Sequence, residues 1–330
     1  MQLYRSRLMP GIPVYCKNIC NLREISTLEQ FTMQSSTANS VVSTRSASLM
    51  LAKDDFVVVT RRKRRGKYNT NNYNKNDTSM PGLNQDYNWI DPERLLCKLK
   101  TMVLNVWSET FTIEVFKQLT EYLTILESND ISNIVCYGLG RFSHNMASRY
   151  QLAFLLCLKK RYEKASIYIY DPLFSSGEMR VLRYLGLRVI ETNEEGKRVI
   201  EENGITLMFL PHCSRQLTNN FLYANWGKGL SNCILLANSL SYISYMWMNW
   251  QVERFGYIMR ILPYVTECQI PEFELEDKAF NGLSLHIFPK QELLKVPNEI
   301  WNFKEEPKYL RDDQELITVA ESNNIEHNNE

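Results

Sequence analysis

The chain has 330 residues, of which 44% are apolar and 12% aromatic, enough to bury a sizeable core in one large domain or two small ones. Its 38 Lys and Arg residues balance 37 Asp and Glu residues, so no global field attracts a polyanion or an acidic membrane surface. No apolar run approaches the ~20 residues that span a bilayer, and we expect no membrane partner.

The eight cysteines and four histidines show no metal-binding or disulfide pattern. No two cysteines form a C-x-x-C pair, and no two histidines form an H-x-x-x-H pair. We therefore expect reduced, intracellular thiols and no metal site.

Residues 1–89 are predicted to form a disordered N-terminal extension. Within it, residues 61–67 place six basic residues in seven positions, and an Asn-rich stretch follows. Such a run does not fold on its own, but closely spaced cations bind acidic grooves or phosphates. The run is either a signal for a nuclear-import receptor or a solvated linker. Because no aromatic residue interrupts it, specific nucleic-acid binding is not expected.

Residues 90–290 are predicted to form a single α/β domain. Asp91 and Pro92 are suited to the start of a helix, as N-cap and first-turn residue, and a second helical stripe follows. From residue 131, short β-rich runs alternate with helical ones, which is typical of a parallel sheet with crossover helices. Residues 291–330 are predicted to be a mostly disordered acidic tail.

The alternating runs predict particular strands and helices. Strands are expected over residues 133–137, 166–170, 188–191, 206–210 and 233–237. Helices are expected over residues 145–159, 176–185, 214–224 and 241–250. Residues 256–261 and 283–288 are candidates for further strands at the sheet edge. The expected fold is a Rossmann-like, doubly wound, mostly parallel sheet of about five to seven strands with flanking helices.

The first predicted strand ends in a G-x-G-x-x-S turn, and a helix starts a few residues later. In such a turn, glycines let the backbone approach a ligand, and free N–H groups at a helix start favour a phosphate or carboxylate. Ser143 departs from the dinucleotide fingerprint, which has Gly or Ala there. Gly138, Gly140, Arg141 and Ser143 are candidate cofactor-binding residues. The alternative is a turn that serves only to close tightly.

Polar residues follow two other predicted strands. Asp171 closes the second strand, where an acid in doubly wound folds bonds the ribose of a dinucleotide or of S-adenosylmethionine. Its alternative role is to cap the turn with Pro172. Asn238 and Ser239 follow the fifth strand, where they can hold a ligand or cap a helix. A nucleoside-type ligand, S-adenosylmethionine or NAD, is therefore a hypothesis, and the cofactor is otherwise unknown.

The fourth predicted strand runs into Pro211, His212 and Cys213. If the first and fourth strands are neighbours, this is the topological switch point, where open α/β sheets bind ligands. His212 is then the candidate catalytic base, and Cys213 is a candidate nucleophile or ligand partner. The alternative is that His212 caps the next helix while Cys213 packs inside. His286, a lone histidine among apolar neighbours, is expected in the core.

Seven sequence blocks occur in order between residues 134 and 239: IVCYGLGRFS, YQLAFLL, YDPLFSSGE, NEEGKR, FLPHC, LYANW and LLANS. This ordered set resembles the sensitivity-to-red-light-reduced family, whose animal members are the SRR-like proteins. The resemblance implies a role in circadian clock input, a link to regulation of heme biosynthesis, and residence in cytoplasm and nucleus. It implies no established reaction.

Two main functions are therefore expected, from different classes. The first is a regulator in a clock-input or heme-regulation pathway, whose Rossmann-like domain binds unidentified protein partners without turnover. The second is an enzyme that binds S-adenosylmethionine or NAD(P) at Gly138 and Gly140, with Asp171 on the ribose and His212 at the reacting atom. A methyltransferase is favoured over an oxidoreductase. Direct heme binding through histidine or cysteine is a third, weaker hypothesis.

Overall fold

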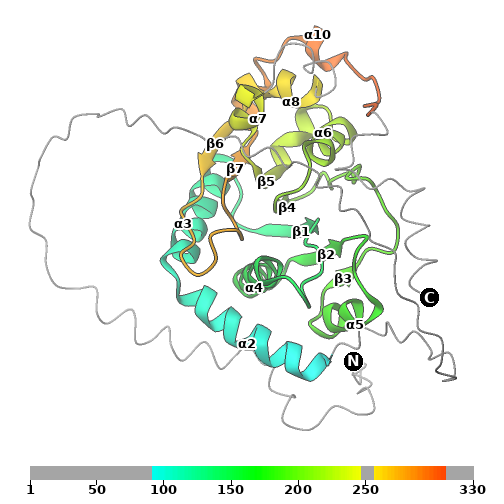
Figure 1. Cartoon of the computed structure of the whole chain (residues 1–330). Helices are drawn as coiled ribbons and strands as arrows, with labels where there is room; N and C mark the ends of the chain where they lie inside the picture. Colours follow the sequence, from blue (N-terminus) through cyan, green and yellow to red (C-terminus); the bar gives the residue numbers. More distant parts are fainter. Residues whose placement is uncertain (1–90, 247–255, 310–330) are drawn as a thin grey trace, which may run out of the picture. The chain divides into compact units, whose positions relative to one another are not determined.

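The computed structural model describes residues 91–246 and 256–309, which belong to one compact unit (Figure 1). The predicted N-terminal extension with its basic run 61–67 lies outside these residues, as does the tail from residue 310. None of the helices described is long and apolar enough to cross a membrane.

A seven-stranded sheet forms the centre of the described residues, in the order β3-β2-β1-β4-β5-β7-β6. The strands are β1 (Ile131–Tyr137), β2 (Ser166–Tyr170), β3 (Arg188–Val189), β4 (Ile205–Leu210), β5 (Cys233–Asn238), β6 (Thr266–Gln269) and β7 (Leu283–Ile287). Strands β1 to β5 are parallel, and β7 is antiparallel to both β5 and β6. The prediction of a doubly wound, mostly parallel sheet is confirmed. Because β1 and β4 are neighbours, the switch point lies between them.

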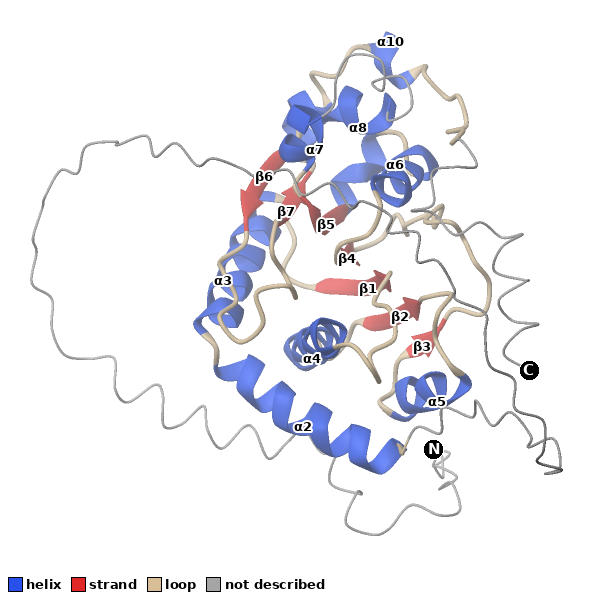
Figure 2. Ribbon diagram, viewed as in Figure 1, coloured by secondary structure: helices blue, strands red, loops and turns tan. Residues whose placement is uncertain are grey.

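Helices cover both faces of the sheet (Figure 2). They are α2 (Pro92–Ser108), α3 (Thr110–Ile125), α4 (Met146–Arg161), α5 (Ser176–Tyr184), α6 (Arg215–Ala224), α7 (Leu240–Met246), α8 (Gly256–Ile261), α9 (Lys290–Leu293) and α10 (Asn298–Trp301). Side chains of a strand alternate between faces. In β1, Ile134 and Cys136 pack in the core with α2 to α5, whereas Val135 and Tyr137 pack in the core with α6 to α8.

Local sequence signals explain several helix starts. The Asp91 side chain accepts hydrogen bonds from the backbone of Glu93 and Arg94, as its N-cap position predicts. Ser175 and Glu178 form a reciprocal capping box at the start of α5. These caps fix where α2 and α5 begin.

Three expectations need correction. Gly256–Ile261, a candidate strand, is helix α8. Its buried residues Tyr257, Ile258 and Ile261 fit helical spacing, and a short apolar run does not distinguish the two. Strand β6 was not expected, because an edge strand with alternating polar residues carries no apolar run. Residues 291–309, expected to be part of a disordered tail, hold α10 and pack against the domain.

Candidate functional site

The G-x-G turn after β1 is held tightly by the protein itself. Gly138 and Gly140 have φ values of 71° and 73°, a left-handed conformation that favours glycine. A Cβ atom on Gly138 would collide with Cys213 Sγ, so the close approach to this glycine is made by a side chain from the end of β4. The turn thus joins the two strands that flank the switch point.

Asp171, at the end of β2, bonds to this turn. Its Oδ2 accepts from the Gly140 N–H at 2.6 Å, and its Oδ1 accepts from the Leu173 N–H at 2.8 Å. The side chain is buried, and burial raises the pKa of its carboxyl, an effect that the two backbone hydrogen bonds only partly offset. A ribose would therefore have to share a buried carboxylate whose two oxygens already accept backbone protons.

Glu178 is a second buried carboxylate at the same place. Its Oε1 accepts from both the backbone N–H and the hydroxyl of Ser143, each at 2.8 Å. Its Oε2 accepts from the backbone N–H and hydroxyl of Ser175, each at 2.9 Å. Sequence reasoning missed this residue, although the S-x-x-E spacing of Ser175 and Glu178 signals a capping box. The carboxylate occupies the position that an anionic ligand would take at the Ser143 amide.

Arg141 and Ser143, the other predicted residues of the turn, also form hydrogen bonds within the chain. Arg141 Nε donates to the carbonyl oxygen of Leu173 at 3.1 Å, which brings Arg141 to the loop after β2. The Ser143 hydroxyl also lies 2.7 Å from His144 Nδ1. The structure therefore brings Gly138, Gly140, Arg141, Ser143 and Asp171 together at the ends of β1 and β2. Whether they bind a cofactor stays a prediction.

His212 and Cys213 lie at the end of β4, as the sequence predicts. His212 is exposed and has a φ of 53°, and its Nε2 lies 3.1 Å from the carbonyl oxygen of Ala279. Because a carbonyl only accepts, Nε2 carries the proton. Cys213 is buried, and its Sγ donates to the Tyr137 carbonyl oxygen at 3.1 Å. Burial, reinforced by the charge of Asp171, raises the pKa of the Cys213 thiol, which argues against a nucleophilic thiolate.

Asn238 and Ser239 lie at the end of β5 and have separate partners. Asn238 Nδ2 donates to the Cys213 carbonyl oxygen at 2.8 Å and so ties the end of β5 to the end of β4. The Ser239 hydroxyl accepts from the Tyr242 N–H at 3.0 Å and caps α7. Asn238 therefore belongs to the switch-point cluster, whereas Ser239 faces a different part of the carboxyl edge.

That part is a cleft of about 760 Å³ over the ends of β5, β7 and β6. It is lined by residues of β6 and β7, of α7, and of the chain just after β5 and just before β7: Ser239, Ser241, Tyr242, Tyr245, Glu267, Gln269, Asn281, Gly282 and Ser284. Sequence reasoning identified only Ser239 among them. The missed residues lack a motif, because they meet through strand pairing and not through spacing in the chain.

Glu267 is the one ionisable carboxyl group among these lining residues. Its Oε2 accepts from the backbone N–H and hydroxyl of Ser241, at 3.0 and 2.7 Å. Burial acts to raise the pKa of Glu267, but the neighbouring His286 and hydrogen bonds with Ser239 and Ser241 outweigh it and hold the pKa well below its ordinary value of 4.5. The residue is therefore an anion in the cleft wall at neutral pH.

His286 is a core residue, as expected. It is fully buried, with Nδ1 3.0 Å from the Leu235 carbonyl oxygen and Nε2 3.3 Å from the Leu240 N–H. Heme ligation by His286 or by the buried Cys213 would require the core to open. In the part of the chain that the structure describes, no three His, Cys, Asp or Glu residues are placed to hold a metal ion.

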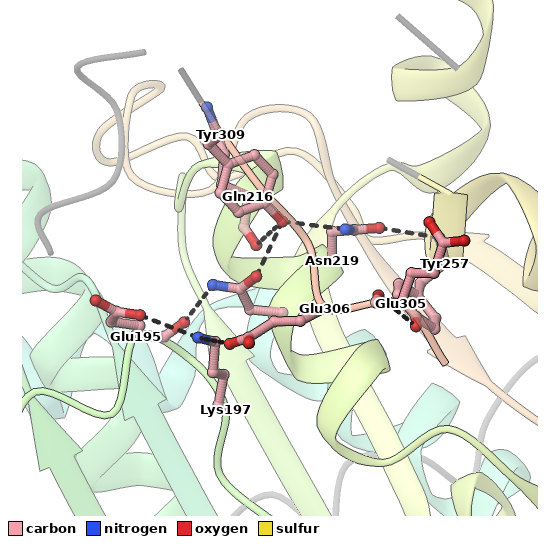
Figure 3. Close-up of polar contacts among 9 residues, drawn as sticks. Glu195, Lys197, Gln216, Asn219, Tyr257, Glu305, Glu306 and Tyr309 are labelled. Atoms are coloured by element: carbon pink, nitrogen blue, oxygen red, sulfur yellow. Dashed lines mark hydrogen bonds and ion pairs between the residues drawn. The ribbon is translucent and has the colours of Figure 1, made fainter. Parts of the chain in front are cut away.

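A polar network fastens residues 303–309, called the strap below, to α6 (Figure 3). The Tyr309 hydroxyl lies 3.0 Å from Asn219 Nδ2 and 2.9 Å from Asn220 Oδ1, and it donates to the Gln216 carbonyl oxygen at 3.2 Å. These three α6 residues are buried, so the strap covers a polar helix face. The buried amides need such partners, because an unpaired buried polar group is costly.

Three further contacts extend the network (Figure 3). Lys197, in the loop after β3, forms ion pairs with Glu195 at 3.2 Å and with Glu306 of the strap at 2.8 Å. The Tyr257 hydroxyl of α8 donates to the Glu305 carbonyl oxygen at 2.8 Å. The strap thus links the loop after β3, α6 and α8 on one face of the sheet.

The fold and this edge define a doubly wound α/β protein with a polar cluster at its switch point. A family model described as the SRR1 domain matches residues 114–287, more than half of the chain. The chain therefore belongs to the SRR1 domain family, which confirms the resemblance carried by the seven ordered blocks.

Individual relatives agree with the family match. An SRR1-like protein of Drosophila melanogaster is 27% identical over 270 residues, 82% of this chain and 95% of the relative. An SRR1-like protein of Mus musculus is 42% identical over 108 residues, 32% of this chain and 43% of the relative. Protein SENSITIVITY TO RED LIGHT REDUCED 1 of Arabidopsis thaliana is 31% identical over 162 residues, 46% of this chain and 58% of the relative.

Among solved structures, a plantazolicin methyltransferase is similar over 63% of this chain and 87% of that chain. Its sequence identity is 15% and its TM-score 0.26. A likeness this weak supports no statement about activity.

Proposed function

We propose that this chain is a regulator in a light-response or circadian clock-input pathway, and that its α/β domain is a binding module without turnover. Family membership supports the pathway, since the Arabidopsis relative is named for sensitivity to red light. The observation that carries the binding-module role is the closed turn, where Asp171 and Glu178 accept N–H groups that a nucleotide phosphate would use. Regulation of heme biosynthesis belongs to the same proposal and rests on the family resemblance alone.

Rescue of a clock phenotype tests this role. The chain is expressed in Drosophila lacking its own SRR1-like protein, 95% of which aligns with it, and the free-running period is measured. We expect the chain to restore the period, and His212→Ala to restore it equally, because a binding module does not need this exposed imidazole. A His212→Ala protein that accumulates normally but restores nothing would contradict the absence of turnover. No effect of the wild-type chain would contradict the pathway.

A second candidate function is an enzyme that uses S-adenosylmethionine or NAD(P). The left-handed backbone of His212 favours it, because strained non-glycine residues cluster at active sites. Thermal unfolding of the full chain with S-adenosylmethionine, NAD and NADP tests this candidate. A ligand at 100 times its dissociation constant adds about 2.7 kcal/mol of stability. A midpoint shift that disappears in Asp171→Ala supports a nucleoside site, and no shift with any ligand removes the candidate.

We further propose that the protein resides in cytoplasm and nucleus, with residues 61–67 read by an import receptor. The support is the density of basic residues in the sequence. Replacing Arg61, Arg62, Arg64 and Arg65 by glutamine should lower the nuclear fraction of a fluorescent fusion severalfold. Unchanged distribution would show that the run is a solvated linker.

A further inference from the structure

The cleft over the ends of β5, β7 and β6 has a negatively charged group in its wall. Glu267 lines it as an anion, and no lysine or arginine of the described residues forms an ion pair with this carboxylate. Its one ionisable contact is His286 Nε2 at 3.6 Å, longer than a hydrogen bond. The remaining donors, from Ser241 and Ser239, are neutral. The wall therefore favours a cationic ligand and disfavours an anionic one.

Aromatic rings flank the same cleft. Tyr242 and Tyr245 line it from α7 and are 61% and 86% exposed, and the neighbouring Met246 is 56% exposed. Large apolar side chains clustered in this way on a surface mark interaction sites. A tyrosine face also attracts an ammonium or guanidinium group, with about 0.5–1 kcal/mol at exposed sites. The rings and the carboxylate thus favour the same kind of ligand.

The loop between β6 and β7 also favours a cationic ligand. The loop between β6 and β7 leaves from Gln269 and returns at Asn281, both of which line the cleft. It carries four acids in residues 272–277, and the structure shows no ion pair to them among the described residues. With Lys278 as the single basic residue of the loop, the segment that leaves from and returns to the cleft is strongly acidic. A volume of about 760 Å³ also exceeds what one side chain fills, so several residues of a peptide fit.

We propose that this cleft binds an arginine or lysine side chain presented by an extended, basic segment of a partner protein. The cationic group lies at Glu267, and the rings of Tyr242 and Tyr245 flank the aliphatic part of the same side chain. The acidic loop attracts other basic residues of the partner segment. The hydroxyl and amide groups of Ser241 and Gln269 offer acceptors for the remaining guanidinium protons. This inference rests on the proposed role as a binding module and gives that role a partner class.

Fluorescence anisotropy with the full chain tests the proposal. The probe is a fluorescein-labelled heptapeptide with a central arginine and a second arginine two residues later, compared with the same peptide carrying glutamine at both positions. We expect the arginine peptide to bind at least tenfold more tightly. Equal affinities for the two peptides would overturn the proposal.

Matched variants locate the binding. Glu267→Gln should weaken the arginine peptide at least tenfold, whereas Glu163→Gln, which changes the net charge equally at an exposed site elsewhere, should not. Tyr245→Ala should weaken it two- to fivefold, and at 86% exposure this change leaves folding intact. If Glu267→Gln unfolds the chain, Tyr245→Ala still decides the outcome. Binding that neither cleft variant changes would be non-specific attraction and would overturn the proposal.

Three outcomes separate this inference from others. Displacement of the peptide by adenosine, with adenosine binding lost in Glu267→Gln, would identify a nucleoside site and overturn the peptide assignment. If the wild-type chain restores the free-running period but does not bind the arginine peptide, the inference fails while the proposed function stands. If it binds the peptide but restores nothing, the proposed pathway fails and the cleft assignment stands.

Discussion

The two halves of the carboxyl edge differ in what fills them. At the ends of β1 and β2, where the sequence shows a nucleotide-like turn, Asp171 and Glu178 occupy the backbone donors and Cys213 packs onto Gly138. At the ends of β5, β7 and β6, where the sequence shows no motif, the structure has an open cleft with an anionic Glu267. A motif-like spacing therefore does not by itself indicate where a ligand has room.

The pKa shifts of the carboxyl groups in the two halves also have opposite signs. Burial raises the pKa of Asp171 in the closed half, whereas hydrogen bonds hold the pKa of Glu267 below 4.5 in the open half, despite burial. A carboxyl group with a raised pKa favours folding when it is protonated, and one with a lowered pKa favours folding when it is ionised. The two carboxyl groups should therefore respond to pH in opposite directions.

The largest effect is expected in the closed half, from Gly138→Ala. The new Cβ meets Cys213 Sγ, and an L-residue at a φ of 71° is strained. Overpacking and left-handed strain together should lower the free energy of unfolding by about 3 kcal/mol. Urea unfolding measures this, with Gly229→Ala as a control, since nothing lies within 4 Å of its added Cβ.

A second substitution locates the cause of that loss. Adding Cys213→Ala to Gly138→Ala should restore about 1–2 kcal/mol, because it removes the sulfur that the Cβ meets. No recovery in the double variant would show that Gly138 is required for its backbone conformation alone.

The next effect, also in the closed half, is expected from Asp171→Asn. An amide group cannot accept both backbone N–H groups, so the free energy of unfolding should fall by about 2 kcal/mol. Because the pKa of Asp171 is raised in the folded protein, its stabilising contribution is complete below the ordinary value of 3.8 and declines as pH rises through the folded pKa. The difference between wild type and variant should therefore be greater near pH 3.8 than at neutral pH. Exposed Asp277→Asn is the control and should show no such trend.

Much of this fold follows from sequence periodicity. Strands β1, β2, β4 and β5 are continuous apolar runs bounded by turns, so they could be predicted nearly to their ends. Strand β6 could not, because Thr266, Glu267 and Gln269 suit an edge strand and resemble a loop. Residues Gly256–Ile261 were misassigned because six residues give too little periodicity.

The candidate site, like the fold, is predictable from the sequence only in part. Residues that follow strands in the chain, such as Asp171, His212 and Asn238, could be placed on the carboxyl edge because parallel strands end there together. Their partners could not be inferred, since the hydrogen bonds from Gly140 to Asp171 and from Ser143 to Glu178 join residues more than thirty positions apart. Sequence spacing predicts where such side chains lie but not which groups they already bond with.

A smaller effect is expected at the strap, which closes the face of α6 by hydrogen bonds. Tyr309→Phe removes the hydroxyl that bonds the buried amide groups of Asn219 and Asn220, so each loses one hydrogen bond. The free energy of unfolding should fall by about 1.5 kcal/mol. Tyr245→Phe, with a hydroxyl on an 86% exposed side chain, is the matched control and should change it little. Faster hydrogen exchange along α6 in Tyr309→Phe alone would locate the loss at the strap, and equal exchange in the two variants would contradict it.

The smallest effect is expected in the open half, from Glu267→Gln. The amide keeps one oxygen for Ser241 but loses the charge that strengthens these hydrogen bonds, so the free energy of unfolding should fall by about 1 kcal/mol at neutral pH. Because the pKa of Glu267 is lowered, its contribution is present above the ordinary value of 4.5 and is lost as pH falls toward the folded pKa. The gap between wild type and Glu267→Gln should therefore narrow on acidification, opposite to the trend for Asp171→Asn. If urea unfolding shows the same pH trend for the two variants, the pKa shifts of Asp171 and Glu267 do not have opposite signs.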